Sequence, residues 1–520
     1  MLPFGPLPEL TITMEGTLHT ASRALRGSSD AWAFLVLYLV CVLLANLIVF
    51  VAGSYSVSHL LATGTLLLAC YPMWRYLDKR EESLPFFPII TLLYGLYYGV
   101  MPFTPFEPYY PYLNVPKDSL IKAGAFSSLG LAVLVVGYYG RPQVPTISRL
   151  PRLSVHWSSD RARQAAVLLG MIGVGAEVLR RTVDVPPNFD AIVYFLQQLS
   201  LLGSGILFYL WLQGRLALPH VLFLCCGLVP LQVLSGLSTG FTFPVIRLVV
   251  FLGMIYVAVR RRIPWRVGAG ALLVLIALMG LKQEYRELEW SEGRPEAARS
   301  ASDVARRGLL FGTVVAQQLR ERRTEAVGDA FEIVTQRMDL LNVFAYLIKL
   351  TPEHVPYLGG ASYSDVLWKF VPRIAYPGKP SPRWGNEFGQ RYALLSPADD
   401  VTSVNLPQML EMYINFGLTG LIIGMWVLAQ LYRALAHTLN HHAGGEWGTV
   451  SAAVVLSSLV NIESNLLLVF GSLIQWVVLL YLLGFWVREP RIISTGVIPK
   501  SDARGSGSSG LGIRKSSGAQ

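Results

Sequence analysis

The chain has 520 residues, of which 53% are hydrophobic and only 15% charged, and its mean hydropathy is +0.46. A soluble domain carries about 25% charged residues, so the composition excludes an ordinary soluble protein and predicts an all-α polytopic membrane protein. The formal net charge is +10, yet residues 282–405 hold 16 basic and 16 acidic side chains. The positive excess therefore lies in short loops and the tail. This pattern is typical of cytoplasmic loops and excludes nucleic acid as a partner.

A membrane-spanning helix needs about 20 mostly apolar residues, and about twelve segments meet this requirement. The third is short and rich in Pro, Tyr and Phe, which also makes it a candidate re-entrant segment. The predicted spans are Ala31–Val51, Val57–Arg75, Phe87–Phe103, Leu120–Tyr139, Gln164–Val178, Ala191–Leu212, Leu216–Leu234, Phe243–Val259, Trp265–Leu281, Leu410–Tyr432, Val450–Phe470 and Leu473–Trp486.

Basic residues cluster in residues 141–163, in residues 260–266 and in the tail from Arg488 onward. With twelve spans all three clusters fall on one side, which the positive-inside rule identifies as the cytoplasm. We therefore expect a protein of the bacterial inner membrane with both termini in the cytoplasm. The predicted division is a cytoplasmic segment 1–30, spans one to nine in 31–281, a large ordered periplasmic loop 282–405, spans ten to twelve in 406–487, and a disordered cytoplasmic tail 488–520.

The first half of the large loop has apolar residues at alternating spacings of four and three, which is typical of an amphipathic helix. Such a helix would lie on the membrane or cap the bundle. The residues of this stripe are Val327, Phe331, Val334, Met338, Leu341, Ala345 and Ile348.

The second half of the loop, residues 368–397, has five basic residues and one acidic residue, Glu387, between rigid prolines. Fixed Arg and Lys side chains bind phosphate oxygens through charge-assisted hydrogen bonds, and aromatic faces suit sugar rings. Contact with lipid headgroups is the alternative interpretation. The basic residues are Lys369, Arg373, Lys379, Arg383 and Arg391, and the aromatic ones are Trp368, Tyr376 and Trp384.

Two further segments place polar groups at the membrane boundary. Lys282 and Arg286 share a helix face at the end of the ninth span, with Tyr285 between them, and would either snorkel to headgroups or bind a lipid-linked pyrophosphate. Glu411 and Asn415 share a face at the start of the tenth span, where such groups are costly unless used or paired. A structural pair between Glu411 and an arginine is the alternative.

The loop residues Val371-Pro-Arg-Ile-Ala-Tyr-Pro-Gly-Lys-Pro380 and the segment Glu411-Met-Tyr-Ile-Asn-Phe-Gly417 resemble the Wzy-type polymerases of O-antigen and exopolysaccharide repeat units. The resemblance covers about fifty residues, together with the general plan of many spans and one late outward loop. It implies a metal-independent, cofactor-free, inverting glycosyltransferase with a fold like the C-type membrane glycosyltransferases. Such enzymes join undecaprenyl-pyrophosphate-linked glycans, and their expected partners are membrane lipids, a flippase and a chain-length regulator.

Without a metal, cations must stabilise the charge that grows on the departing pyrophosphate. Arg286, Arg373 and Lys379 are assigned this role first, followed by Arg383 and Arg391. A base for the acceptor hydroxyl must be a carboxylate or a histidine within hydrogen-bond reach, which makes Glu411 the first candidate and His354 the second. Lys282 and Tyr285 are assigned to substrate binding, and Tyr376, Tyr413 and Asn415 to the sugar site or to holding Glu411.

Other functions remain open. The same chemistry could serve a ligase that transfers the finished glycan to another acceptor. A flippase or other transporter of lipid-linked glycans would need charges along a central path through several spans, and a structural or assembly protein would need no reactive groups. The concentration of polar residues at one face disfavours the transporter.

Overall fold

The computed structural model of the chain describes residues 11–79, 82–108, 110–140, 144–183, 185–238, 243–274, 306, 309–310, 312–314, 325–365, 376 and 383–489. Met1–Arg488 forms one compact unit and Glu489–Gln520 a separate one. Over the described residues the first unit is all-helical, with an isolated bridge between Trp157 and Arg488 and no strand. The predicted all-α class is confirmed for this part of the chain.

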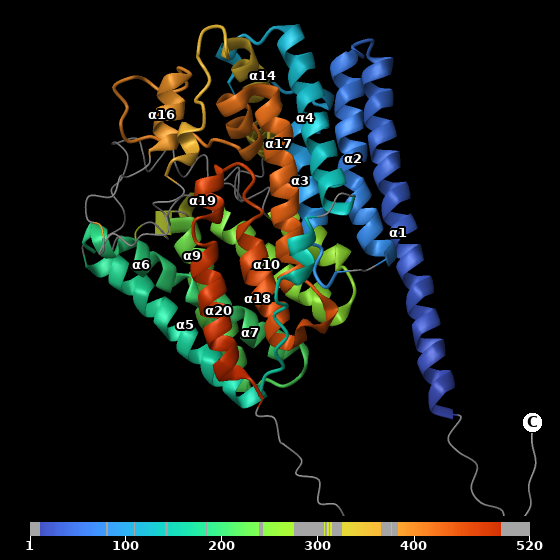
Figure 1. The fold of residues 1–520 in the computed structure, drawn as a ribbon, viewed down its shortest axis with the longest axis vertical. Helices are drawn as coiled ribbons and strands as arrows, with labels where there is room; N and C mark the ends of the chain where they lie inside the picture. Colours follow the sequence, from blue (N-terminus) through green and yellow to red (C-terminus); the bar gives the residue numbers. More distant parts are fainter. Residues whose placement is uncertain are drawn as a thin grey trace, which may run out of the picture. The chain divides into compact units, whose positions relative to one another are not determined.

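The helices follow the chain in the order shown in Figure 1. They are α1 Thr11–Val51, α2 Val57–Lys79, α3 Phe86–Gly99, α4 Lys117–Tyr139, α5 Ser159–Thr182, α6 Pro187–Gln197, α7 Leu199–Leu212, α8 Leu218–Leu222, α9 Val229–Ser238, α10 Phe243–Arg260, α13 Glu325–Arg337, α14 Leu340–Leu350, α16 Trp384–Arg391, α17 Gln408–Leu439, α18 Gly445–Ser458, α19 Leu466–Phe470 and α20 Leu473–Val487. A π-helix, η4 (Phe223–Leu228), joins α8 to α9, and short 3-10 turns are η1 Met101–Phe103, η2 Pro111–Leu113, η3 Pro145–Arg149, η5 Ala361–Tyr363 and η6 His442–Gly444.

Nine helical stretches of the described chain are long and apolar enough to cross a membrane. Seven coincide with the first, second and fourth to eighth predicted spans: Ser29–Val51, Val57–Lys79, Lys117–Tyr139, Ser159–Thr182, Asn188–Leu212, Leu218–Gly236 and Phe243–Arg260. The third predicted span is the 14-residue α3, and the ninth is described only as the shorter apolar helix Trp265–Val274. The other two stretches, Gln408–Leu439 and Leu466–Val487, contain the tenth and twelfth predicted spans and are longer than predicted.

The predicted eleventh span, Val450–Phe470, is interrupted. Helix α18 ends at Ser458, and α19 begins only at Leu466, so residues 459–465 form a non-helical turn. The cause is local: the side chain of Asn465 accepts a hydrogen bond from the Leu468 N–H and starts a new helix. A helix of 14 residues is about 21 Å long, which is shorter than the ~30 Å hydrocarbon core of a bilayer. Helix α18 alone is therefore shorter than a membrane span.

The lower ends of α5 and α20 come together at one end of the first unit in Figure 1. The Ser158 N–H donates to the Val487 carbonyl at 3.1 Å, and the Leu153 N–H to Thr438 at 2.9 Å. Arg261 lies 3.0 Å from His442 Nδ1. These contacts join the loop before α5, the end of α10 and the end of α20, as the charge pattern predicts.

The opposite end carries α14 and α16. Helix α14 buries its apolar face on α3 and α4, and the Phe344 ring packs against Tyr98, Phe126 and Tyr413. The predicted amphipathic helix is thus present, and it caps the bundle. It is divided into α13 and α14 because the buried Asp339 carboxylate accepts the Asn342 N–H and begins the second helix.

Candidate functional site

The segment with the sequence Glu411-Met-Tyr-Ile-Asn-Phe-Gly417 is the first part of α17, and this part ends in a break. Gly417 has φ 64° and ψ −151°, a backbone conformation that is essentially restricted to glycine. A Cβ added to Gly420 would lie 2.6 Å from the Met412 carbonyl oxygen, whereas residues eight apart in a straight helix are about 12 Å apart. The chain therefore reverses at Gly417, so the predicted span Leu410–Tyr432, which lies within the candidate span Gln408–Leu439, contains a break.

Glycines make the reversal possible on both sides of the turn. A Cβ on Gly417 would lie 2.7 Å from the Tyr357 hydroxyl, and a Cβ on Gly424 would lie 2.6 Å from the Met412 side chain. Small residues let two helical segments approach closely inside a membrane protein. The first half-helix, residues 408–415, is consequently a buried re-entrant element that packs along the second half of α17.

A helix that ends inside a protein leaves carbonyl groups without hydrogen-bond partners. Here a loop between α14 and α16 donates hydrogen bonds to these carbonyl groups. The Leu358 N–H donates to the Ile414 carbonyl at 2.9 Å, and the Gly359 N–H to the Asn415 carbonyl at 3.1 Å. The Gly360 N–H donates to Asn415 Oδ1 at 2.9 Å. The carbonyl groups at the end of the half-helix and the side chain of Asn415 thus bind this loop.

Glu411 lies at the centre of this arrangement and is fully buried. Its Oε1 accepts a hydrogen bond from the Ser362 hydroxyl and its Oε2 accepts one from the Leu466 N–H, both at 2.8 Å. The Asn415 amide donates to Ser362 Oγ at 2.8 Å, so Asn415 orients the group that holds Glu411. No arginine of the described chain pairs with the carboxylate, which two neutral donors hold instead.

Two tyrosines lie on the elements that meet at this carboxylate. Tyr413 is buried, and its hydroxyl donates to the Thr351 carbonyl at 3.2 Å. Burial, and to a smaller extent the negative charge of Glu411, raise the pKa of Tyr363 above its ordinary value. Tyr413 therefore joins the end of α14 to the half-helix. The hydroxyl group of Tyr363 interacts electrostatically with Glu411.

An open cavity of about 500 Å³ adjoins this centre. Leu358 and Ile414 form one wall, and α16 forms the other. The backbones of Leu358 and Ile414 are joined by a hydrogen bond. Helix α16 contributes Trp384, Glu387 and Arg391, which lie on one helix face by their spacing of three and four. An aromatic ring, a carboxylate and a guanidinium in one cavity are suited to a charged or hydroxylated ligand such as a sugar phosphate.

The side chains of α16 are anchored from outside the cavity. The Trp384 indole N–H donates to Asp365 Oδ2 at 2.9 Å, and Arg391 Nη2 donates to the Pro356 carbonyl at 2.9 Å. Arg391 is nevertheless exposed. The loop that holds the half-helix thus also fixes the cavity wall, and Arg391 is the predicted cation that the structure brings next to the Glu411–Asn415 segment.

The other predicted residues lie elsewhere or are not described. His354 is exposed in the turn after α14, and Arg383 is exposed at the start of α16, where Nη1 contacts the Asp400 carbonyl at 3.5 Å. Tyr376 is 42% exposed. The remaining predicted site residues lie outside the described residues: Lys282, Tyr285, Arg286, Arg373 and Lys379.

One cation was missed by the sequence analysis. Arg247 lies near the start of α10, at the end of that helix opposite the basic cluster of Arg260, and donates to Gln198 Oε1 at 2.5 Å. Its Nε and Nη2 atoms are buried and have no partner among the described residues. Buried charged donors without partners are costly, and inside a membrane they point to function. A single arginine in an apolar run carries no pattern that would reveal this.

The other polar insertion in these helices is fully paired. Arg181 forms an ion pair with Glu177, which also accepts hydrogen bonds from Gln197 and from Ser235. This network joins α5, α6 and α9 and is structural. The contrast marks Arg247 as the cation available for a ligand, and the described part of the chain holds no cluster of three or more His, Cys, Asp or Glu side chains suited to a metal.

Comparison with known proteins gives one match. A protein-family model, described as a domain of unknown function (DUF8712), matches residues 116–492. No curated protein and no solved structure matches the chain.

Proposed function

The chain belongs to this family of unknown function, and we propose that it is a membrane glycosyltransferase that joins undecaprenyl-pyrophosphate-linked repeat units into a surface polysaccharide. The observation that carries the proposal is the re-entrant half-helix. It holds the buried carboxylate of Glu411 within one helical turn of Ile414, which lines the cavity below α16. A broken helix in a membrane protein is tolerated where it is enclosed by protein or lines a cavity.

The proposed reaction uses these groups in sequence. An acceptor hydroxyl takes the place of the Ser362 hydroxyl beside Glu411 and gives up its proton to the carboxylate. Its oxygen forms a bond to the anomeric carbon of the donor sugar. The bond between that carbon and the pyrophosphate oxygen breaks, and undecaprenyl pyrophosphate leaves with the electron pair. Trp384 and Arg391 bind the sugars in the cavity.

Cations stabilise the charge that develops on the leaving pyrophosphate. Arg286, Arg373 and Lys379 are proposed for this role from the sequence, and Arg247 joins them because two of its buried nitrogen atoms have no partner among the described residues. The role of the guanidinium is geometric as well as electrostatic, since its donors form a fixed fork that matches phosphate oxygens.

The test is deletion of the gene, with a plasmid-borne copy as control, followed by electrophoresis of the surface polysaccharide. Loss of the polymer ladder with retention of a single repeat unit supports the polymerase. Polymer that accumulates on the lipid carrier without reaching its final acceptor indicates a ligase. Loss of every outward glycan, including the single unit, indicates a transporter and overturns the proposal.

A further inference from the structure

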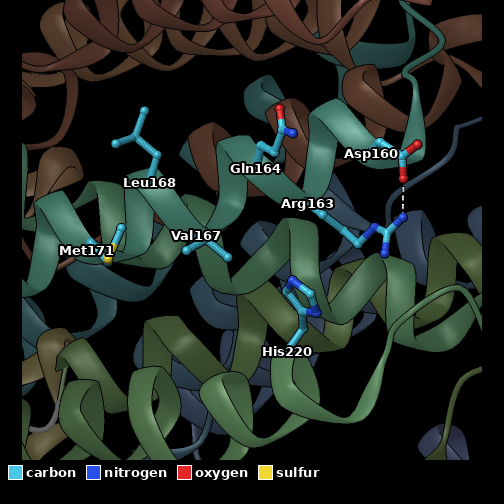
Figure 2. Close-up of a pocket in the computed structure, with 7 residues that line it drawn as sticks. All are labelled: Asp160, Arg163, Gln164, Val167, Leu168, Met171 and His220. Atoms are coloured by element: carbon cyan, nitrogen blue, oxygen red, sulfur yellow. Dashed lines mark hydrogen bonds and ion pairs between the residues drawn. The ribbon is translucent and has the colours of Figure 1, made fainter.

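A second cavity, of about 620 Å³, lies between α5 and α8, far along the chain from the site described above. Figure 2 shows that Asp160, Arg163 and Gln164 line it near the start of α5, and that His220 faces them from α8. The wall continues along α5 as an apolar strip. That strip consists of Val167, Leu168 and Met171.

The polar part of this cavity lies at the basic end of the bundle. Helix α5 begins at Ser159, next to the end of α20, where Arg161 Nη1 donates to the Arg488 carbonyl at 3.1 Å. From Asp160 to Met171 the helix rises about 16 Å, which is close to half the ~30 Å hydrocarbon core. The cavity therefore has the length and the polarity of one lipid molecule in one leaflet.

Its apolar strip is uncovered. Leu168 is 46% exposed and Met171 55% exposed, and both belong to a helix with the length and composition of a membrane span. The opposite wall leads from α8 into the π-helix η4, a rare element that is frequent at functional sites. Helix η4 packs closely on α5, because a Cβ on Gly170 would lie 3.1 to 3.2 Å from the side chains of Phe223 and Leu228.

The polar groups at the mouth carry both signs of charge. Arg163 forms an ion pair with Asp160, whose side chain is 77% exposed, and an exposed pair of this kind is weak enough to be exchanged for a ligand. His220 Nδ1 is buried and has no partner in the described part of the chain. A phosphate would accept hydrogen bonds from Arg163 and His220, while a primary amine would donate to Asp160.

We propose that this cavity binds a phospholipid with an ethanolamine headgroup, taken from the leaflet at the basic end of the bundle. The phosphate lies between Arg163 and His220, the amine at Asp160, and one acyl chain along Leu168 and Met171. The proposal rests on the chain spanning a membrane and is independent of the glycosyl transfer chemistry.

The test uses the full-length protein in detergent and counts retained lipids by native mass spectrometry after addition of phosphatidylethanolamine, phosphatidylcholine or phosphatidylglycerol. The wild-type protein should retain one phosphatidylethanolamine at least fivefold more strongly than the other two. Arg163→Gln should abolish this retention. Arg149→Gln is the matched control, because Arg149 is an exposed arginine of the same end that does not line the cavity.

Two further variants separate the headgroup from the acyl chain. Leu168→Trp should fill the strip and reduce retention, whereas Leu179→Trp, at a residue of α5 with nearly the same exposure of 45%, should not. Asp160→Asn should abolish the preference for ethanolamine over glycerol and leave binding of the phosphate. Equal retention by wild type and Arg163→Gln, or no preference among the three lipids in the wild type, would overturn the proposal.

Discussion

The backbone N–H of Leu466 donates to Oε2 of Glu411 at 2.8 Å and joins the start of α19 to the re-entrant half of α17. A second contact supports the first, since the Gln408 N–H donates to the Ile462 carbonyl at 3.3 Å. The turn at residues 459–465 and the half-helix 408–415 therefore stabilise one another. The two contacts hold the polar groups of both elements next to one another.

Glu411→Gln should separate chemistry from folding. The amide has the size of the carboxylate. Its oxygen can accept the Leu466 N–H while its nitrogen donates to Ser362 Oγ, which retains acceptor capacity. We expect a free energy of unfolding within about 1 kcal/mol of the wild-type value. We expect polymer synthesis to fall about 10²–10⁴-fold, as for removal of a general base. A normal polymer ladder in this variant would exclude Glu411 as the base.

Ser362→Ala is the structural counterpart. It removes the donor to Glu411 Oε1 and one acceptor of the Asn415 amide, so a buried carboxylate oxygen is left without a partner. Loss of a hydrogen bond to a charged group costs about 1.5–3 kcal/mol, and the unfolding temperature in detergent should fall accordingly. An unchanged unfolding temperature would mean that the loop does not hold the carboxylate.

Gly417→Ala should disrupt the reversal of α17. The backbone conformation costs about 1–3 kcal/mol for a residue with a side chain, and the new Cβ would lie 2.7 Å from the Tyr357 hydroxyl. The measurement is the yield and unfolding temperature of the purified variant. Gly175→Ala is the control: apart from the chain neighbours and the backbone of α5 itself, no described atom lies within 4 Å of the added Cβ, so this variant should be as stable as wild type or more so.

Arg247→Met should leave the protein folded and inactive. Replacement of a buried, incompletely paired charge by an apolar side chain is often neutral or stabilising, so the unfolding temperature should stay constant or rise while polymer synthesis is lost. Arg181→Met is the comparison, because it leaves Glu177 without its cation and should cost about 3 kcal/mol. Full activity of Arg247→Met would show that Arg247 binds no substrate phosphate.

Asp339 makes stability depend on pH. Burial raises the pKa of this carboxyl from 3.8 to about 6, so the folded protein binds the proton more tightly than the unfolded chain does. Stability is then greatest below pH 4 with respect to this group, falls as pH rises from about 4 to about 6, and is constant above that. The difference is roughly 3 kcal/mol.

Asp339→Asn tests this dependence. The amide oxygen can still accept the Asn342 N–H at the start of α14, but the group no longer ionises. Unfolding temperatures measured between pH 4 and pH 7 should show a smaller decline than in wild type, and the variant should be the more stable protein at pH 7. An unchanged pH profile would place the titration in another group.

Most of the helices follow from apolar runs, which is why α2, α4 and α10 lie within a few residues of the predicted spans. The errors in the predicted spans have one physical origin: hydropathy depends on composition and does not show where the chain changes direction. Leu410–Tyr432 is mostly apolar, yet the chain reverses within it at Gly417. Asn465 ends a similar run by capping α19. Both residues were visible in the sequence as polar or small insertions.

The site was predictable where a motif is continuous. Glu411 and Asn415 were expected to act together, and the structure joins them through Ser362, which lies some fifty residues earlier and has no spacing relation to either. Arg247 could not be found for the same reason. Its unusual character consists of partners that are missing from the space around it, and a linear pattern does not contain that information.

The bond between Leu466 and Glu411 also determines when the site is complete during biosynthesis. A chain emerges from the ribosome with its N-terminal part first, so the half-helix 408–415 reaches the membrane before residues 462–466 that supply its partners. Until then the Glu411 carboxylate lacks its backbone donor, and the half-helix cannot adopt its final position. A topology reporter fused near Asn440 would therefore sample an assembly intermediate and not the finished protein.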